Sequence, residues 1–143
     1  MLRISKLTDY AMLIMSQMAK APDAILSAKE LAYALHLSAA TVSKILKILA
    51  DADLVKSIRG ALGGYQLSRP SDAISVADII AAMEGNVALT ECCQKINQCN
   101  INSICTMKDN WRKINELVST YLGTVTITDM LKPLSTQRFW DDK

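Results

Sequence analysis

The sequence predicts a mainly α-helical fold with a small β-hairpin wing: a winged helix-turn-helix domain followed by a long C-terminal dimerisation helix. Three observations predict it. Half of the 143 residues are hydrophobic, and only five are glycine and three are proline, so most of the chain can form helices. Capping residues precede stretches in which apolar side chains recur at helical spacing. A glycine-rich segment separates two short alternating stretches, as in a hairpin.

Apolar spacing and capping residues predict the first three helices. Apolar side chains between residues 8 and 20 recur near helical spacing. Ser27 and Glu30 form a capping box for a second helix that continues through Ala34. Ser38 caps a third helix with a polar and basic outer face. The buried stripe of this third helix is expected to be Val42, Ile45, Leu46 and Leu49.

A hairpin follows the three helices. Residues 54–58 and 65–67 alternate like two short strands on either side of the glycine-containing segment 59–64. Ser75 and Asp78 form a second capping box, which opens a helix that ends near Met83. Three helices and a hairpin are the winged helix-turn-helix arrangement.

The longest helix is expected from Met107 to about Leu122, and Thr126 caps a last short helix. One face of the long helix carries Trp111, Ile114, Leu117 or Val118, and Tyr121. A lone helix must bury such a face. Because the first half of the chain is expected to have its own small core, pairing with the same helix of a second chain predicts a homodimer.

Composition divides the chain into four segments. Residues 1–70 form the winged helix-turn-helix region, residues 71–106 a linking helix and a cysteine loop, residues 107–134 the dimerisation helix with the last short helix, and residues 135–143 a mobile tail. Residues 1–70 carry nine Lys or Arg and five Asp or Glu, a net charge of +4, whereas residues 71–143 carry seven and nine, a net charge of −2. A basic first half fits a surface that faces phosphates, although a solvated charged face has the same composition.

Several classes of protein are not expected. The N-terminal stretch carries Arg3, Lys6 and Asp9 and has too short an apolar run for a signal peptide, and no segment approaches a membrane span. A cytoplasmic protein is therefore expected. Neither a nucleophile–base pair nor a phosphate-binding loop is visible, so we expect neither an enzyme nor a small-molecule substrate.

The four cysteines form one cluster in the sequence. Cys93, Cys99 and Cys105 are separated by five residues each, and Cys92 precedes the first of them. In a reducing compartment, clustered thiols favour metal binding or redox chemistry over a disulfide framework. Ligand type and spacing leave zinc and an iron–sulfur cluster nearly level, with a structural use of the cysteines as a third alternative.

These residues resemble the Rrf-type bacterial regulators, the IscR- and NsrR-like iron–sulfur transcriptional regulators. The resemblance covers almost the whole chain. The segment 88–93 looks most like the subgroup that regulates the SUF iron–sulfur assembly operon. The matching pieces are Leu7-Thr8-Asp9-Tyr10-Ala11, Val55 through Arg59-Gly60, Gly63-Gly64-Tyr65, Ser75 to Ile80 and the three spaced cysteines.

The resemblance implies a dimer that binds an iron–sulfur cluster through Cys93, Cys99 and Cys105. IscR-like members have a histidine three residues after the last cysteine, where this chain has Lys108. The single histidine, His36, precedes the third helix and is expected to be a surface or capping residue. Two candidates for the fourth ligand remain: Asp9, which matches an acidic residue that NsrR-like members contribute from the partner subunit, and Cys92. A two-iron and a four-iron cluster both stay open.

The resemblance also implies binding to a double-stranded DNA operator. In a winged helix the outward residues of the third helix reach bases and phosphates, and an arginine at the start of the wing can enter a narrow minor groove, as in related regulators. Each lysine has the alternative of being an ordinary solvated charge. The candidate DNA-binding residues are Ser38, Ala40, Thr41, Ser43, Lys44, Lys47 and Arg59.

The expected function is repression of SUF assembly genes when clusters are plentiful. A nitric-oxide-sensing repressor of the NsrR type and a zinc-stabilised DNA-binding module are the alternatives. The chain departs from the family pattern once more at Asp53, where members have a glycine between the third helix and the wing. Aspartate tolerates a left-handed backbone better than most residues, so the turn is expected to survive.

Overall fold

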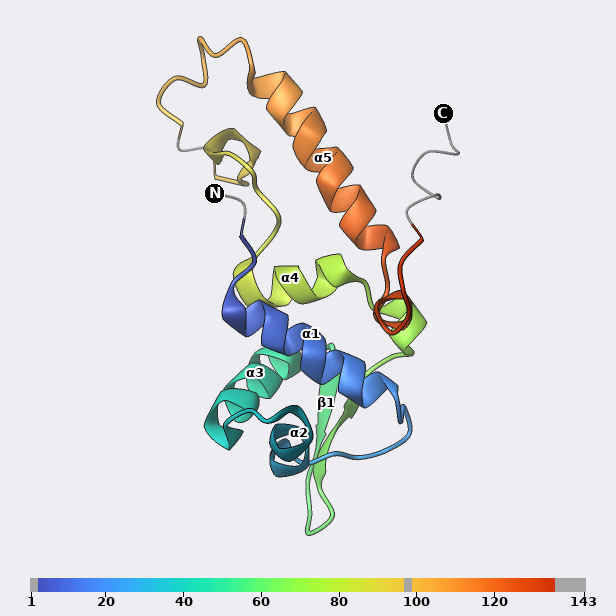
Figure 1. Cartoon of the computed structure of the whole chain (residues 1–143). Helices are drawn as coiled ribbons and strands as arrows, with labels where there is room; N and C mark the ends of the chain where they lie inside the picture. The colour runs from blue at the N-terminus through green and yellow to red at the C-terminus, as the bar shows by residue number, and fades with distance from the viewer. Residues whose placement is uncertain (1–2, 97–98, 136–143) are drawn as a thin grey trace.

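The computed structural model describes residues 3–96 and 99–135. Apart from Ser135, the mobile tail expected at 135–143 lies outside these residues. The structure is mainly helical with one antiparallel hairpin, which confirms the predicted fold class (Figure 1). Its elements are α1 Lys6–Ala19, α2 Ala28–Leu35, α3 Ala39–Asp51, β1 Val55–Ile58, β2 Gly64–Leu67, the 3-10 turn η1 Ser71–Ala73, α4 Val76–Glu84, the 3-10 turn η2 Glu91–Cys93, α5 Lys108–Thr124 and α6 Ile127–Met130.

The helices begin at the capping residues. Reciprocal capping boxes open α2, α4 and α6 through Ser27 with Glu30, Ser75 with Asp78, and Thr126 with Asp129. At α1 the expected start was two residues late, because the Ser5 side chain accepts a hydrogen bond from the Thr8 amide at 3.2 Å and the helix begins at Lys6. Local side-chain chemistry therefore sets most of the helix starts.

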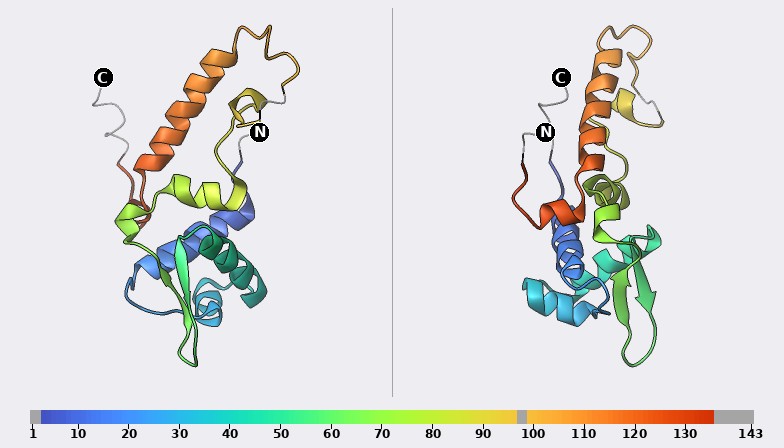
Figure 2. Two further views of the ribbon diagram at one scale, coloured as in Figure 1. Left: turned by 180° about the vertical axis from the view of Figure 1, so that it is seen from behind. Right: turned by 90° about the vertical axis from the view of Figure 1, so that its right-hand side faces the viewer.

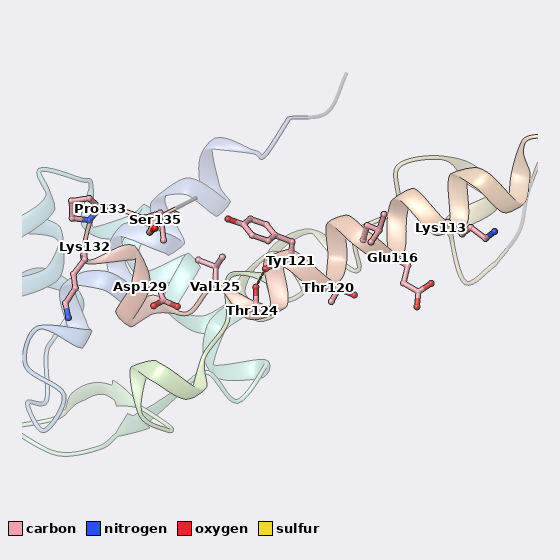
Figure 3. A pocket seen from close by; sticks show the side chains of 12 residues that line it. Lys113, Glu116, Thr120, Tyr121, Thr124, Val125, Asp129, Lys132, Pro133 and Ser135 are labelled. Carbon is pink, nitrogen blue, oxygen red and sulfur yellow. Dashed lines mark hydrogen bonds between the residues drawn. The ribbon is translucent and has the colours of Figure 1, made fainter. Parts of the chain in front are cut away.

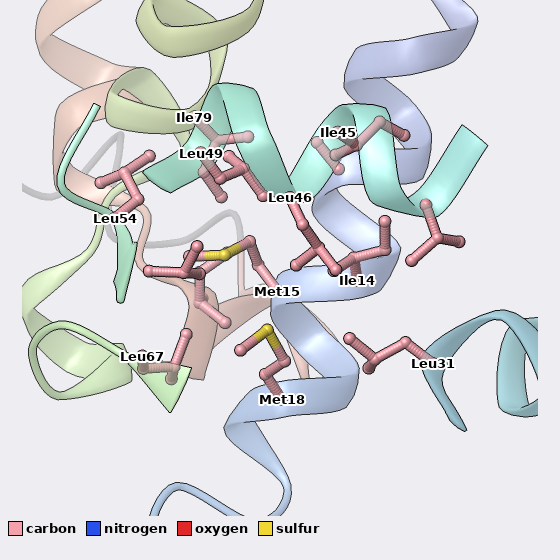
Figure 4. Packing of buried hydrophobic residues seen from close by; sticks show 14 of the residues in the cluster. Ile14, Met15, Met18, Leu31, Ile45, Leu46, Leu49, Leu54, Leu67 and Ile79 are labelled. Atoms are coloured by element: carbon pink, nitrogen blue, oxygen red, sulfur yellow. The ribbon is translucent and has the colours of Figure 1, made fainter. Parts of the chain in front are cut away.

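The hydrophobic core lies between α1, α3 and the hairpin (Figure 4). The predicted stripe of α3 is completely buried. On the hairpin side, Leu67 of β2 is buried and Tyr65 packs against the core at its edge. The strands pair in register, with Val55 opposite Leu67 and Ile58 opposite Gly64. Figure 4 shows Ile14, Met15 and Met18 of α1 between α3, α2 and the wing.

The core continues beyond residue 70. Ile74, Ile79 and Ile127 belong to the same buried cluster, and each is fully buried. Backbone hydrogen bonds from Val76 to Val125 at 2.8 Å and from Ile127 to Ile74 at 3.0 Å hold the start of α4 against α6. The sequence analysis expected a complete core within the first half, whereas the last short helix also contributes to it.

Helix α5 has a different environment. It extends away from the N-terminal core, and the cysteine loop lies at its N-terminal end (Figure 2). None of its 17 residues is buried, although Tyr121 and Leu122 pack on a small second cluster. Trp111 and Leu117 are 40% and 66% exposed. In the described part of the chain, no helix is both long and apolar enough to cross a membrane.

Candidate DNA interface and metal site

Helix α3 presents a polar and basic surface. The Ser38 hydroxyl accepts a hydrogen bond from the Thr41 amide at 3.2 Å and donates to the Thr41 hydroxyl at 2.7 Å, so both side chains help to start the helix. Ala40, Ser43, Lys44 and Lys47 are exposed on the face opposite the buried stripe. Neither lysine forms an ion pair within the described residues, so both ammonium groups can bind phosphates.

The wing is fastened to the loop that precedes α2. Leu26 and Tyr65 exchange two backbone hydrogen bonds, of 2.9 and 2.8 Å. Between them the backbones approach so closely that a Cβ added at Gly64 would lie 2.6 Å from the carbonyl oxygen of Leu26. The hairpin turn is closed by a hydrogen bond from the Gly63 amide to the Gly60 carbonyl. Arg59 is exposed at the start of this turn.

The turns that follow α3 and α2 each contain a residue with positive φ, Asp53 and His36, and both residues agree with the sequence analysis. Asp53 adopts a left-handed backbone, with φ of 57°, and the wing follows it directly. Ser68 supports the turn because its hydroxyl donates a hydrogen bond to the carbonyl of Asp53. His36 is the exposed left-handed C-cap of α2, with φ of 53°. The expectation that His36 is a surface or capping residue is confirmed.

The first cysteines lie against the beginning of α5. Arg112 donates a hydrogen bond from Nε to the carbonyl oxygen of Cys92 at 3.3 Å. The Cys93 thiol donates to the carbonyl oxygen of Trp111 at 3.6 Å. The Thr90 hydroxyl contacts both sulfurs, at 3.1 Å from Cys92 and 3.2 Å from Cys93. The two neighbouring thiols therefore share one polar contact, although adjacent side chains commonly point in different directions.

The four cysteines are half-buried, and the single chain does not gather them into a complete site. Cys105 lies three residues before α5, so both ends of the cysteine loop meet the first turns of this helix. Among the described residues, no group of three His, Cys, Asp or Glu side chains lies close enough to hold a metal ion. Asp9 is exposed in the first turn of α1, and Lys108 is the half-buried first residue of α5.

A carboxylate that the sequence analysis did not select connects α4 to α1. Glu84 Oε1 accepts hydrogen bonds from the Thr8 hydroxyl and, at 2.8 Å, from the Ser5 amide. These hydrogen bonds, chiefly the one from Thr8, hold the pKa of Glu84 below its ordinary value. Figure 1 shows the start of α1 and the cysteine segment near the same end of α4. No spacing pattern marks Glu84, because its partners lie 76 and 79 residues away.

A groove of about 940 Å³ follows α5 towards the last described residues (Figure 3). Leu117, Thr120, Tyr121 and Thr124 of α5 form one wall, and the segment 132–135 lies opposite. Leu117 and Tyr121 of this wall belong to the apolar face that the sequence analysis assigned to dimerisation. In this chain the face is only partly covered.

The three-helix unit, the exposed basic helix and the attached wing define a DNA-binding protein of the winged helix-turn-helix class. The chain belongs to the Rrf2 family, whose model, described as "Iron-dependent Transcriptional regulator", matches residues 4–133. The family to which the sequence motifs pointed is thereby confirmed. The chain is a transcriptional regulator and not an enzyme.

Its relatives are regulators of the same kind. The chain is 35% identical over 97 residues to HTH-type transcriptional regulators of Neisseria meningitidis, a match that spans 68% of this chain and 65% of theirs. It is 31% identical to the HTH-type transcriptional regulator NsrR of Oceanobacillus iheyensis, over 92% of this chain and 90% of that protein.

Solved structures agree with the fold. The structure of CymR, the global cysteine regulator of B. subtilis, superposes with a TM-score of 0.72 at 32% identity, covering 92% of this chain and 97% of that one. The structure of T. potens IscR gives a TM-score of 0.69 at 27% identity and covers 97% of each chain. The similarity thus extends over the cysteine loop and α5 as well as the DNA-binding unit.

Proposed function

We propose that this regulator senses an iron–sulfur cluster and represses the SUF genes for iron–sulfur assembly. The observation that carries the proposal is the loop of three evenly spaced cysteines, in which Cys93 contacts the first turns of α5 and Cys105 lies three residues before this helix. The family's description as iron-dependent supports iron over zinc. A regulator of this kind acts on chromosomal DNA, so the proposal places it in the cytoplasm.

The chemistry of the donors fits such a cluster. Thiolates are its usual ligands, and Cys93, Cys99 and Cys105 would hold it. When bound, a cluster of two or four irons supplies strong bonds that tie these sulfurs together. The exposed carboxylate of Asp9 is available to a second chain, and Cys92 is the alternative fourth ligand.

The proposal includes a homodimer that pairs through α5. Its groove is lined by Leu117 and Tyr121, and the helix has no buried residue of its own. Two copies would place their α3 helices in successive major grooves of a pseudo-palindromic operator, about 34 Å apart. In each copy Arg59 would lie in the adjacent minor groove. The residues at the start and on the outer face of α3 that would face DNA are Ser38, Ala40, Thr41, Ser43, Lys44 and Lys47.

The sensing mechanism follows from what holds the two functional parts together. The loop meets α5, whereas α3 contacts α4 and α1 in the shared core. If Asp9 of one copy completes the site of the other, α1 of the first copy would be held against the cysteine loop of the second. Because α3 packs against α1 in the core, the position of α3 relative to the partner would then be fixed as well. Loss of that connection changes the spacing of the two α3 helices and therefore the affinity for DNA.

A nitric-oxide-sensing repressor is the second candidate. It is favoured by the relative named NsrR, which matches over 92% of this chain, and by Lys108 in place of a histidine. Dissociation from DNA on nitric oxide, without a response to cluster supply, would support it. A zinc-stabilised DNA-binding module without a sensing role is the third candidate.

The deciding experiment is anaerobic purification followed by visible absorption and iron, sulfide and zinc analysis. Wild type, Asp9→Ala and the exposed control Asp23→Ala are compared. We expect brown protein containing iron and sulfide, with a spectrum altered by Asp9→Ala and unaltered by Asp23→Ala. Colourless protein with stoichiometric zinc would refute the proposal and support the third candidate.

DNA binding is then compared for holo and apo protein on DNA selected by the holo protein from a random pool. We expect a difference in affinity at one fixed salt concentration. Equal affinities would remove the cluster from the mechanism, even if it binds.

A further inference from the structure

Asn115 of α5 forms two hydrogen bonds with the segment 87–89, which precedes the first cysteines. Its side-chain oxygen accepts a hydrogen bond from the Leu89 amide at 2.8 Å, and its side-chain nitrogen donates to the Val87 carbonyl at 3.1 Å. The partners are 26 and 28 residues away in the sequence. One half-buried side chain thus pairs with both an N–H and a C=O of the same short segment, as a neighbouring strand would.

The segment held by Asn115 continues directly into the first thiols. Thr90 follows Leu89, and its hydroxyl contacts the sulfur of Cys93 at 3.2 Å. The Cys93 thiol in turn donates to the carbonyl of Trp111, which is one helical turn before Asn115. The hydroxyl can therefore donate to the sulfur while the thiol donates to α5, so the position of Cys93 depends on where residues 87–89 are held.

Cys93 and Asn115 also line the same hollow, of about 670 Å³, between α4 and α5. Glu84, at the end of α4, lies on another part of its wall. The thiol therefore borders open space that a ligand or a second chain can enter. Helix α5 buries none of its residues, and the two hydrogen bonds of Asn115 attach it to this segment beside the apolar packing of Val87 with Tyr121 and Leu122.

We propose that Asn115 is a positioning residue that holds the Cys93 thiol at a fixed place on α5. It thereby sets the position of the first thiolate relative to the helix that we assign to dimerisation. The positioning itself is a property of the apo chain, whereas its consequence for an iron–sulfur cluster rests on the proposed function. The two can be tested separately.

The apo test uses Asn115→Ala, with Asn110→Ala as the matched control. Asn110 is exposed in the first turn of the same helix, so the change in helix propensity is alike in both variants. Alkylation of Cys93 and Cys105 by iodoacetamide is followed by peptide mass spectrometry, and exchange of the Leu89 amide by NMR. With Asn115→Ala, we expect Cys93 alkylation and Leu89 exchange to rise on the order of tenfold, the effect of losing about one net hydrogen bond from a local opening equilibrium.

Cys105 and Asn115→Asp distinguish positioning from general loosening. Cys105 alkylation should stay constant, and Asn115→Asp should retain Leu89 protection because a carboxylate oxygen can still accept from that amide. Unchanged Cys93 alkylation and Leu89 exchange in Asn115→Ala would overturn the proposal. An equal rise at Cys93 and Cys105 would overturn it too, since the loop would then have loosened as a whole.

The holo test measures the visible circular dichroism and the iron-release rate of protein reconstituted with iron and sulfide. We expect an altered spectrum and about tenfold faster release for Asn115→Ala, with wild-type behaviour for Asn110→Ala. If wild type takes up no iron, the proposed function fails while the apo result still decides the role of Asn115. If Asn115→Ala and wild type release iron equally, Asn115 does not position the ligand.

Discussion

Thr8 is the single completely buried polar residue of the described core, and its hydroxyl has two hydrogen-bond partners. It donates to Glu84 and lies 3.0 Å from the Ser5 hydroxyl. The same carboxylate oxygen accepts from the Ser5 amide, at the positive end of the α1 dipole. One residue at the end of α4 thereby holds the start of α1, which carries the candidate ligand Asp9.

The link predicts a measurable coupling between Thr8 and Glu84. Thr8→Val preserves shape but removes the hydroxyl, so we expect a loss of about 1–2 kcal/mol in the free energy of unfolding by urea. In a double-mutant cycle with Glu84→Ala, the effects should fall short of additivity by about 1 kcal/mol. Additive effects would show that the two side chains do not stabilise each other.

The same carboxylate predicts a pH dependence. The pKa of Glu84 is lowered from 4.5, chiefly by the hydrogen bond from Thr8 and then by that from the Ser5 amide. A folded pKa below the unfolded value gives stability that is present above about pH 4.5 and is lost as the pH falls through the folded pKa. Urea unfolding between pH 7 and pH 3 should therefore show a stability difference between wild type and Glu84→Gln that becomes smaller as the pH falls below about 4.5. A difference independent of pH would contradict this origin.

At the scale of elements, the sequence predicted what local chemistry determines. Ser27, Ser38, Ser75 and Thr126 cap the helices that they were expected to cap, because each bonds to an amide three residues away. The 3-10 turn at Glu91–Cys93 and the bonds of Asn115 were not predicted. The bonds of Asn115 join residues 26 and 28 positions apart, and the turn contacts α5 across 18 and 20 positions. Such contacts leave no periodic pattern in the sequence.

The close backbone contact between the wing and the loop before α2 gives a prediction for Gly64. A Cβ there would lie 2.6 Å from the Leu26 carbonyl oxygen, and backbone cannot move aside as a side chain can. Gly64→Ala should therefore separate the hairpin from the loop before α2, at a cost of about 2 kcal/mol in thermal unfolding experiments and with weaker DNA binding. The control is Gly123→Ala in α5, where nothing lies within 4 Å of the added Cβ and helix propensity should raise stability by about 0.5–1 kcal/mol. Equal effects of the two changes would refute this packing argument.

The exposed face of α3 gives a prediction for Lys44. If its ammonium group contacts a phosphate, Lys44→Ala should lower the slope of log affinity against log salt by about 0.9. The measurement is a fluorescence anisotropy titration at several salt concentrations, on DNA selected by wild type from a random pool. Lys20→Ala, at the end of α1, should leave the slope unchanged. An unchanged slope for Lys44→Ala would identify an ordinary solvated lysine.

At the scale of the molecule, the DNA-binding unit is packed into a buried core, whereas α5 has no buried residue. The DNA-binding unit shares a buried core with α4 and α6, to which Ile127 contributes from the far end of the sequence. Helix α5 has its polar attachments at the cysteine segment and an apolar face that is only partly covered. Sequence periodicity located that face, but it could not show that the DNA-binding core depends on α6, because such packing is not local.

The partly covered face predicts the outcome of a charge placed in the groove. Leu117 is 66% exposed and lines the groove along α5. In a dimer paired through α5, Leu117→Lys would bury an unpaired ammonium group, a cost that marginal interfaces do not withstand. Sedimentation equilibrium should show a dimer for wild type and a monomer for Leu117→Lys. The matched control is Leu62→Lys at the wing tip, where the leucine is 91% exposed, so this variant should remain dimeric.

A monomer binds only one half-site of the operator. The affinity of Leu117→Lys for selected palindromic DNA should therefore fall by a factor of about 100 or more at roughly physiological salt, because the avidity of two linked recognition helices is lost. A dimeric Leu117→Lys variant would exclude α5 pairing, and a monomer with undiminished affinity would show that the two half-sites are read independently.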